Sequence, residues 1–413
     1  MSVASPPKKR IEIVDALRGI ALAGIVIVHM VENYVGAPTP EGVMDATHAG
    51  VADSVVDVFI GLFLRGKFFA LFSFLFGLSF FIQMDNANAK GAQFGGRFLW
   101  RLLILLAIGY VHHLFYRGDI LTIYALLGIL LIPFYRVKNK WILGIICLIF
   151  LGLGRYIVFA LTQGESLFME TGFAPDSPEI VSYFDIIKNG TLGEVFYSNG
   201  YQGHIMKAEF QLGIFSRAYL TFAFFLLGLY VGRLQFFQNF LDHKKLVKKV
   251  LIWSLILFVV SLALLALIFM QLGPEVQFDN WLAMAGLTAI DLNNIAMTFI
   301  LLALFTMGYR TLRGKKWLGS FAPYGRMALT NYVAQSILGT FLLFGWGLGY
   351  LGELRNIYTF LIGLAVIALQ MAFSAWWLRN FHYGPLEWVW RSLTYFKWYP
   401  LKKSPAPAET QIG

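Results

Sequence analysis

The chain has 413 residues, of which 58% are apolar, 17% aromatic and only 14% charged. Soluble domains carry roughly 45–50% apolar and about 25% charged residues, so this composition excludes a water-soluble enzyme, and its richness in aromatic residues excludes a disordered chain. The mean hydropathy of +0.65 and the formal net charge of +10 instead indicate an integral membrane protein with basic loops rather than a nucleic-acid-binding protein.

Ten stretches of the chain have the composition of a membrane-crossing helix, which needs about 20 predominantly apolar residues. In chain order they cover residues 16–34, 67–83, 98–116, 119–135, 141–162, 216–234, 250–271, 288–309, 327–345 and 356–378. The apolar run 54–64 is too short to cross alone, so it is either interfacial or part of an eleventh span. We therefore expect an all-α, polytopic membrane helical bundle.

The basic residues indicate how this bundle is oriented. Of the 33 Lys and Arg residues, 24 fall in the N-terminal segment, the C-terminal segment and every second loop between the predicted spans. Cytoplasmic loops carry an excess of Lys and Arg, so this alternation predicts that both termini are cytoplasmic.

The chain is expected to form a single integral membrane domain over residues 1–399. Its N-terminal half, 16–162, and its C-terminal half, 215–399, hold five predicted spans each, and a long external loop, 163–214, joins them. A connection of that length is usually functional or has structure of its own. We expect the proline-containing tail, 400–413, to be disordered.

The first span carries ionisable residues at helical spacing. A 3-4-3-4-3 pattern places them on one stripe of a helix, formed by Asp15, Arg18, Leu22, Ile25, His29 and Glu32. Arg18 and His29 are eleven residues apart, which is roughly 16 Å along a helix axis. Arg18 would then lie at the cytoplasmic entrance and His29 in the outer half of the bilayer. Ionisable groups at this depth indicate a functional site.

The third span repeats this spacing. Arg101 precedes His112 by eleven residues, and His113 and Asp119 follow. A neutral histidine can accept a proton from a hydroxyl or amine, and a carboxylate such as Asp119 or Glu32 can fix its tautomer. Asp119 could equally be the N-cap of the next helix.

Other polar residues give weaker signals. Arg65 and Lys67 at the start of the second span could bind an anionic headgroup or phosphate, or extend their charges to the interface. Arg326 and Asn331 belong to a polar stripe on the ninth span that is expected to face the bundle interior. The sequence contains no phosphate-binding loop, dinucleotide fingerprint or metal-ligand cluster, and its sole cysteine, Cys147, excludes an internal disulfide.

Several stretches together resemble the YeiB-like family of bacterial membrane proteins, whose C-terminal half is domain of unknown function 418. They are residues 14–21 (VDALRGIA), 67–77 (KFFALFSFLFG), 118–125 (GDILTIYA), 325–336 (GRMALTNYVAQS) and 376–391 (WWLRNFHYGPLEWVWR). The family is distantly similar to transmembrane acyltransferases, including the lysosomal heparan-glucosaminide acetyltransferase. Acyltransferase-3 proteins also carry an Arg and a His separated by ten intervening residues in their first span, a spacing that Arg18 and His29 reproduce, whereas Asn is more usual at position 29 in YeiB-like proteins.

This resemblance implies a multi-pass acyltransferase of the bacterial inner membrane. Acyl-CoA, with an acetyl group favoured, would be the donor, and a hydroxyl or amine of a cell-envelope glycan or lipid would be the acceptor. We expect the catalytic residues to be His29, His112 and Asp119, the donor-binding residues to be Arg18, Arg101 and Lys67, and the supporting residues to be Asp15, Glu32, His113, Arg326 and Asn331.

Two other functions remain open at this stage. A transporter or lipid exporter could use the buried His and Arg residues as a proton or anion pathway, although the sequence shows no inverted repeat or pair of broken helices. A non-catalytic membrane protein would explain the composition but not the buried histidines. Membrane lipids are expected partners and nucleic acid is not, no metal is expected, and the oligomeric state is open, a dimer included.

Overall fold

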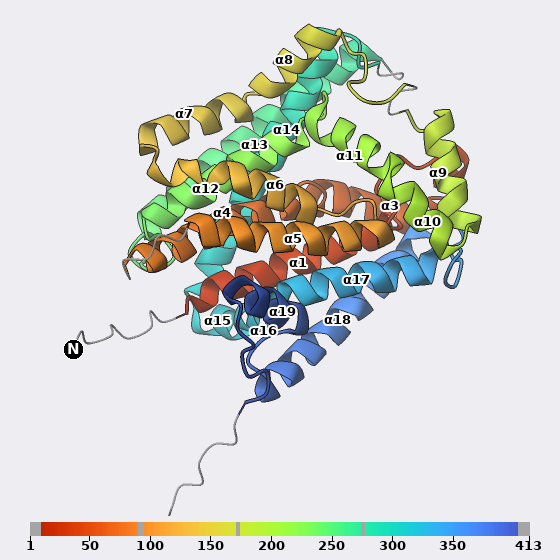
Figure 1. Cartoon of the computed structure of the whole chain (residues 1–413). Helices are drawn as coiled ribbons and strands as arrows, with labels where there is room; N and C mark the ends of the chain where they lie inside the picture. Colours follow the sequence, from red (N-terminus) through yellow and green to blue (C-terminus); the bar gives the residue numbers. More distant parts are fainter. Residues whose placement is uncertain (1–9, 90–94, 171–173, 274–276, 404–413) are drawn as a thin grey trace, which may run out of the picture.

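The computed structural model describes residues 10–89, 95–170, 174–273 and 277–403, and within these ranges the chain is all-helical (Figure 1). The N-terminal half contains α1 (Glu12–Val31), α2 (Glu41–Thr47), α3 (Val51–Phe59), a π-helical turn (Ile60–Leu64), α4 (Lys67–Asn88), α5 (Gly95–Phe115), α6 (Leu121–Leu131), a 3-10 turn (Pro133–Arg136), α7 (Asn139–Phe150) and α8 (Leu153–Thr162). The remainder contains α9 (Pro178–Asn189), α10 (Leu192–Gly200), α11 (Gln202–Leu212), α12 (Arg217–Arg233), α13 (Lys244–Leu272), α14 (Trp281–Tyr309), α15 (Leu312–Gly319), α16 (Ala322–Arg326), α17 (Ala328–Leu343), α18 (Asn356–Asn380) and α19 (Pro385–Tyr395).

Each of the ten predicted apolar stretches coincides with a helix or a bent pair of helices. By length and composition, 6 helices can cross a membrane, or up to 8 when each bent pair counts as one span. The predicted stretches 119–135 and 327–345 correspond to the shorter apolar helices Leu121–Arg136 and Ala328–Leu343. The helical membrane bundle is therefore confirmed, whereas the count of ten spans and the cytoplasmic placement of both termini remain predictions. The run 54–64 forms the end of α3 and the π-helical turn, which lead directly into α4.

Two sharp bends were not revealed by the sequence: one lies within the predicted span 141–162, and the other lies where the predicted span 216–234 joins a helix of the long connection 163–214. The helix axis bends by 52° between α7 and α8 and by 63° between α11 and α12. Gly152 adopts a positive φ at the first break, and Ser216 does so at the second. A left-handed backbone at one residue ends a helix and redirects the chain.

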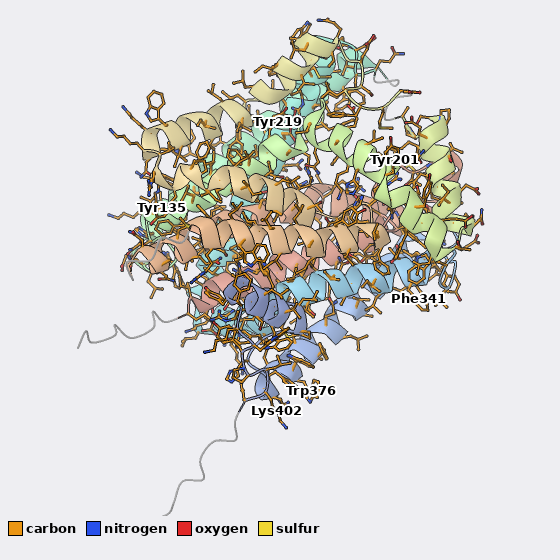
Figure 2. All side chains as sticks on the ribbon, in the orientation of Figure 1. Tyr135, Tyr201, Tyr219, Phe341, Trp376 and Lys402 are labelled. Carbon is orange, nitrogen blue, oxygen red and sulfur yellow. The ribbon has the colours of Figure 1, made fainter. Side chains whose placement is uncertain are left out.

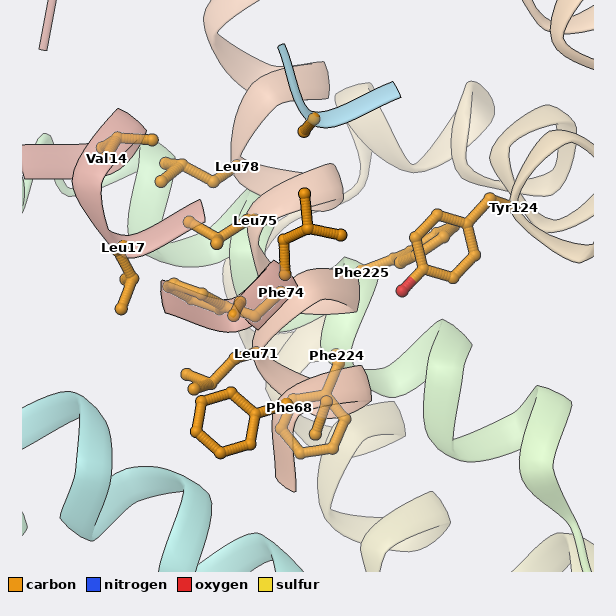
Figure 3. Packing of buried hydrophobic residues seen from close by; sticks show 14 of the residues in the cluster. Val14, Leu17, Phe68, Leu71, Phe74, Leu75, Leu78, Tyr124, Phe224 and Phe225 are labelled. Carbon is orange, nitrogen blue, oxygen red and sulfur yellow. The ribbon is translucent and has the colours of Figure 1, made fainter. Parts of the chain in front are cut away.

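The core of the bundle lies between α1, α4 and α12. Phe68, Leu71, Phe74 and other large side chains of α4 pack against α1 and α12 (Figure 3). Glycines bring α4 and α12 into backbone contact: a Cβ on Gly77 would lie 2.0 Å from the carbonyl oxygen of Phe225, and one on Gly228 would lie 2.0 Å from that of Phe74. The two helices run side by side in the same direction.

The long connection 163–214 folds into helices of its own. α9, α10 and α11 gather at the end of the bundle opposite the start of α1 (Figure 1). Thr191 and Glu194 form a reciprocal capping box at the start of α10. The inner face of α9 is apolar, with Ile180 and Ile187 fully buried, whereas α11 buries the polar side chains of Lys207, Glu209 and Gln211.

The outer surface of the bundle is rich in exposed apolar side chains. Phe341 is 44% exposed, Trp376 is 54% exposed, and both lie on the outside of the molecule (Figure 2). α13 is the extreme case, because only 11% of its most apolar window is buried inside the protein. Contiguous exposed apolar surface of this extent is typical of helices that contact lipid.

The C-terminal segment turns back onto the bundle. Glu387 of α19 accepts hydrogen bonds from the backbone N–H groups of Leu329 and Thr330 at 2.7 and 3.2 Å, so it caps the start of α17. Residues 400–403 of the predicted tail run beside the end of α18, where Lys402 forms an antiparallel bridge with Phe381. The rest of that predicted tail lies outside the described residues.

Candidate functional site

Two cavities adjoin inside the bundle. The large cavity, about 570 Å³, is lined by residues of α1, α4, α8, α11, α12, α14 and α17, and by the connection between α5 and α6. The small cavity, about 240 Å³, lies nearer the start of α1 and is lined by residues of α1, α4, α5, α17 and α19. Tyr124 and Tyr332 line both cavities, so they lie at the junction.

His29 lines the large cavity close to this junction. Its ring lies among three tyrosines, with centroids 5.1 Å from Tyr116, 5.6 Å from Tyr34 and 6.1 Å from Tyr332. The Nδ1 atom lies 3.3 Å from Nε2 of Gln335, whose carbonyl oxygen accepts a hydrogen bond from Tyr34. With Nδ1 accepting from this amide, the proton of a neutral His29 ring resides on Nε2.

His112 forms a buried pair with Asp119. The Nδ1 atom of His112 lies 2.7 Å from Oδ1 of Asp119, and both side chains are almost fully buried. The Nε2 atom of His112 is also buried and has no hydrogen-bond partner among the described residues. Because the carboxylate holds the proton on Nδ1, Nε2 is left as a free acceptor. The ring centroid lies 5.1 Å from that of Tyr332, so His29 and His112 flank the same tyrosine.

Asp119 serves both roles that its sequence position suggested. It caps α6, because its carboxylate accepts from the N–H groups of Leu121 and Thr122, each at 3.0 Å. It also pairs with His112 and lies 3.6 Å from Nζ of Lys207, measured to Oδ2. A buried carboxylate with this many donors is fixed in position.

The small cavity contains three of the predicted cationic side chains, which are those of Arg18, Arg101 and Arg326. Arg18 donates to Asp15 and to Ser79, both at 2.9 Å. The guanidinium of Arg101 lies over the ring of Trp390, 3.5 Å from its centroid. Glu387 also lines this cavity, and its burial raises the pKa of its carboxyl group despite the hydrogen bonds that it accepts.

The other predicted residues belong neither to the group around the two histidines nor to the arginines of the small cavity. Glu32 lines the large cavity but pairs with Arg65 at 2.7 Å rather than with a histidine. Lys67 is buried at the start of α4 and donates to the carbonyl of Gly61, away from Arg18 and Arg101. The ring of His113 stacks on the ring of His204 of α11, with 4.1 Å between the ring centroids. Asn331 joins α17 to α18 by donating to Ser374 at 2.9 Å.

Several residues of the site escaped the sequence analysis. Lys207 was assigned to an external loop, and Arg155 and Arg217 belonged to no predicted motif, yet all three line the large cavity. Tyr332 was also missed, whereas Gln335 belongs to the polar stripe that begins at Arg326 and that was expected to face the bundle interior.

The fold and this site define a multi-helix membrane protein with a buried histidine–carboxylate pair beside two adjoining cavities. His29 and Asp119 line the large cavity, whereas His112 lines neither and contacts Tyr332 at their junction. Residues 10–188, which carry His29, His112 and Asp119, match the family model "Heparan-alpha-glucosaminide N-acetyltransferase, catalytic", and residues 231–397 match "Protein of unknown function (DUF418)". The chain is 29% identical to YxaH of Bacillus subtilis (strain 168) over 96% of each chain. It is 28% identical to a 39.9 kDa protein in the amylase 3' region of Bacillus acidopullulyticus, over 95% of this chain and 96% of the relative.

A third relative covers most of both chains. YeiB of Escherichia coli (strain K12) is 25% identical over 92% of this chain and 95% of its own length. The two domain matches and these full-length relatives confirm the resemblance to the YeiB-like family that the sequence showed.

Proposed function

We propose that the chain is a membrane acyltransferase that moves an acyl group, with acetyl favoured, from cytosolic acyl-CoA to an external acceptor. The acceptor carries a hydroxyl or amine and belongs to a cell-envelope glycan or lipid. The observation that carries the proposal is the placement of both His29 and the His112–Asp119 pair next to Tyr332, which lines the two cavities where they meet. The match to an acetyltransferase catalytic domain over the segment that holds these residues supports it.

The small cavity is suited to the donor. Arg18, Arg101 and Arg326 offer guanidinium groups, which bind phosphate oxygens through paired hydrogen bonds. Its volume of about 240 Å³ is below the roughly 300–1,000 Å³ of pockets that enclose a whole ligand, so it would take the narrow thioester arm while the nucleotide stays outside. The acyl group would then reach the junction at Tyr124 and Tyr332.

The two histidines have complementary hydrogen-bonding states. Nε2 of His112 is a free acceptor, so His112 is the general base that takes the proton from the acceptor hydroxyl or amine. Nε2 of His29 carries a proton, so His29 can donate to the thioester oxygen as negative charge develops on it. The acceptor atom bonds to the acyl carbon, the carbon–sulfur bond breaks, and His112 returns the proton to the thiolate to give free CoA.

A test of this proposal measures thiol release from acetyl-CoA by the purified chain in nanodiscs with cell-envelope extract as the acceptor source. His112→Gln should lower the turnover number by about 10²–10⁴-fold, because a positioned base contributes that much. His382→Gln is the control, since His382 is exposed just after the end of α18, whereas His112 is buried against Asp119 and Tyr332. Acetyl-CoA binding with no turnover in any extract, or full turnover in His112→Gln, would contradict the proposal.

One observation favours a lipid transporter as the second candidate. Both bent helix pairs contribute to the large cavity, through Arg155 of α8 and through Gln211 and Arg217 beside the α11–α12 break. Broken helices around a central cavity are typical of secondary transporters. Lipid or proton flux in proteoliposomes without acyl-CoA, lost in Asp119→Asn but with no CoA released under any condition, would favour this candidate over the enzyme.

A further inference from the structure

The large cavity has more cationic than anionic side chains. Among the described residues, five Lys or Arg and three Asp or Glu line it. Each carboxylate has a cationic partner, in the pairs Glu32–Arg65, Asp119–Lys207 and Asp291–Arg155. Two arginines, Arg117 and Arg217, have no carboxylate partner within the described parts of the chain.

Arg217 is the first residue of α12, directly after the break from α11. Its guanidinium lies over the ring of Phe69, 3.5 Å from the centroid. It makes no ion pair among the described residues, although the carboxylates of Asp291 and Glu32 lie near enough to attract it. The attraction between a cation and an aromatic ring is modest, so the ring replaces only part of the attraction that an anion would supply. Arg217 lines the large cavity.

Two helices begin at this part of the cavity. α4 and α12 pack side by side (Figure 3) and run in the same direction, because Arg217 lies over Phe69 and Gly232 lies against Phe81, so their N-termini lie at the same end of the pair. Neither N-terminus has a side-chain cap. Gly66, which precedes α4 with a φ of +83°, lines the cavity, and the side chain of Asn294 packs against it. Uncapped N–H groups and the positive end of the helix dipole both favour an anion.

Arg117 gives an independent indication of an anionic ligand. It is only 2% exposed, lines the same cavity, and its Nε atom has no hydrogen-bond partner among the described residues. Its contacts are the ring of Tyr183 at 3.2 Å, the sulfur of Met206 at 3.0 Å and the hydroxyl of Ser198 at 3.4 Å, all of them uncharged. Burial of an uncompensated cation is costly, so a ligand that brings a negative charge into the cavity would be stabilised.

We propose that the large cavity binds a phosphate ester, with the phosphate held by Arg217 at the paired N-termini of α4 and α12. The fork of a guanidinium matches phosphate oxygens, and the apolar wall formed by Phe68, Leu287 and Ile290 accepts the organic part of the ester. The ester is a phospholipid headgroup or a soluble phosphate compound. The inference rests on the proposed function in one respect, because it identifies this phosphate ester as the acyl acceptor.

The test measures binding without acyl-CoA, by thermal unfolding of the purified full chain in an uncharged detergent. The probes are dioctanoyl phosphatidylglycerol, glycerol 3-phosphate and the phosphate-free dioctanoylglycerol at equal concentrations. A phosphate ester should raise the melting temperature by about 2–4 °C, since a ligand that binds the native state stabilises it. Arg217→Gln should lose this shift, Arg217→Lys should keep part of it, and the control Arg136→Gln, exposed and outside both cavities, should keep all of it.

The probes separate the two sources of phosphate. A shift with dioctanoyl phosphatidylglycerol alone supports a lipid ligand, and a shift with glycerol 3-phosphate supports a soluble one. An equal shift with dioctanoylglycerol, or a full shift in Arg217→Gln and Arg217→Lys, overturns the proposal. So does loss of CoA binding in Arg217→Gln without a response to either ester, because the arginine would then serve the donor. Phosphate binding that depends on Arg217, found together with no acyl transfer, would refute the proposed function while leaving this site in place.

Discussion

The buried contact between Asp119 and Lys207 makes a quantitative prediction about stability. Oδ2 and Nζ are 3.6 Å apart, and both side chains are more than nine-tenths buried. At an effective dielectric constant of about 20, Coulomb's law gives an attraction of about 5 kcal/mol, most of which offsets the cost of removing both charges from water. Removing Lys207 leaves the buried Asp119 carboxylate with hydrogen-bond donors but without this cation, and removing the carboxylate leaves the buried Lys207 ammonium with the Thr122 hydroxyl.

We therefore expect Asp119→Asn and Lys207→Met each to lower the free energy of unfolding by about 3–5 kcal/mol. The double variant should be less destabilised than the two single effects combined, with a coupling energy of about 1–3 kcal/mol. Reversible unfolding in mixed micelles measures all four proteins of this cycle. Asp119→Asn should also lower turnover by about 10⁴-fold, as loss of the carboxylate does in serine-protease triads, because the proton on Nδ1 of His112 is no longer fixed.

A matched control is available on the surface. Lys188 and Glu353 are separated by a similar distance, 3.5 Å, but their side chains are 35% and 62% exposed. The same cycle on this pair should give a coupling of only about 0–1 kcal/mol. Additive effects at Asp119 and Lys207, or equal coupling in both pairs, would refute the argument that burial makes this contact strong.

Three further predictions concern the donor cavity, the helix contact and the capping carboxylate. Arg18→Gln and Arg101→Gln should each raise the KM for acetyl-CoA by about 10–100-fold, measured by thiol release, because each removes a charge-assisted hydrogen bond worth about 1.5–3 kcal/mol. Gly228→Ala should lower the melting temperature, since its Cβ would lie 2.0 Å from a backbone carbonyl of α4, whereas Gly144→Ala on α7, with nothing within 4 Å, should be neutral or slightly stabilising. Burial raises the folded-state pKa of Glu387, so its contribution to stability is complete below the unfolded value of about 4.3 and is lost as pH rises through the raised value. Unfolding of Glu387→Gln should lack this pH dependence, and an unchanged pH profile would contradict the assignment.

The sequence was sufficient to locate the helices and part of the site. Apolar stretches of about 20 residues coincide with helices because a long apolar segment satisfies its backbone hydrogen bonds most simply as a helix. The eleven-residue spacing from Arg18 to His29 and from Arg101 to His112 correctly placed each pair on one helix. The structure then brings both arginines to the small cavity and both histidines to Tyr332.

The rest of the site depends on tertiary packing that periodicity does not encode. Lys207 occurs in a polar connection with no apolar pattern of spanning length, and it reaches Asp119 because α11 folds back over the cavity at the break before α12. That break is made by Ser216, a residue that carries no strong signal for a left-handed backbone. Arg217 was overlooked for a similar reason, since an arginine at the start of an apolar helix ordinarily marks only the membrane interface.

The junction at Tyr124 and Tyr332 has a consequence for the energy supply of the cell. Both rings are 2% exposed, and the hydroxyl of Tyr332 accepts from the N–H of Ile120 while that of Tyr124 contacts Ser73. If the small cavity opens to the cytoplasm and the large cavity opens to the external face, these two rings form the thinnest barrier to ions between the two sides of the membrane. A water-filled gap between the rings would let protons leak across the membrane and dissipate their gradient. The acyl group must therefore pass this point without a continuous column of water forming there.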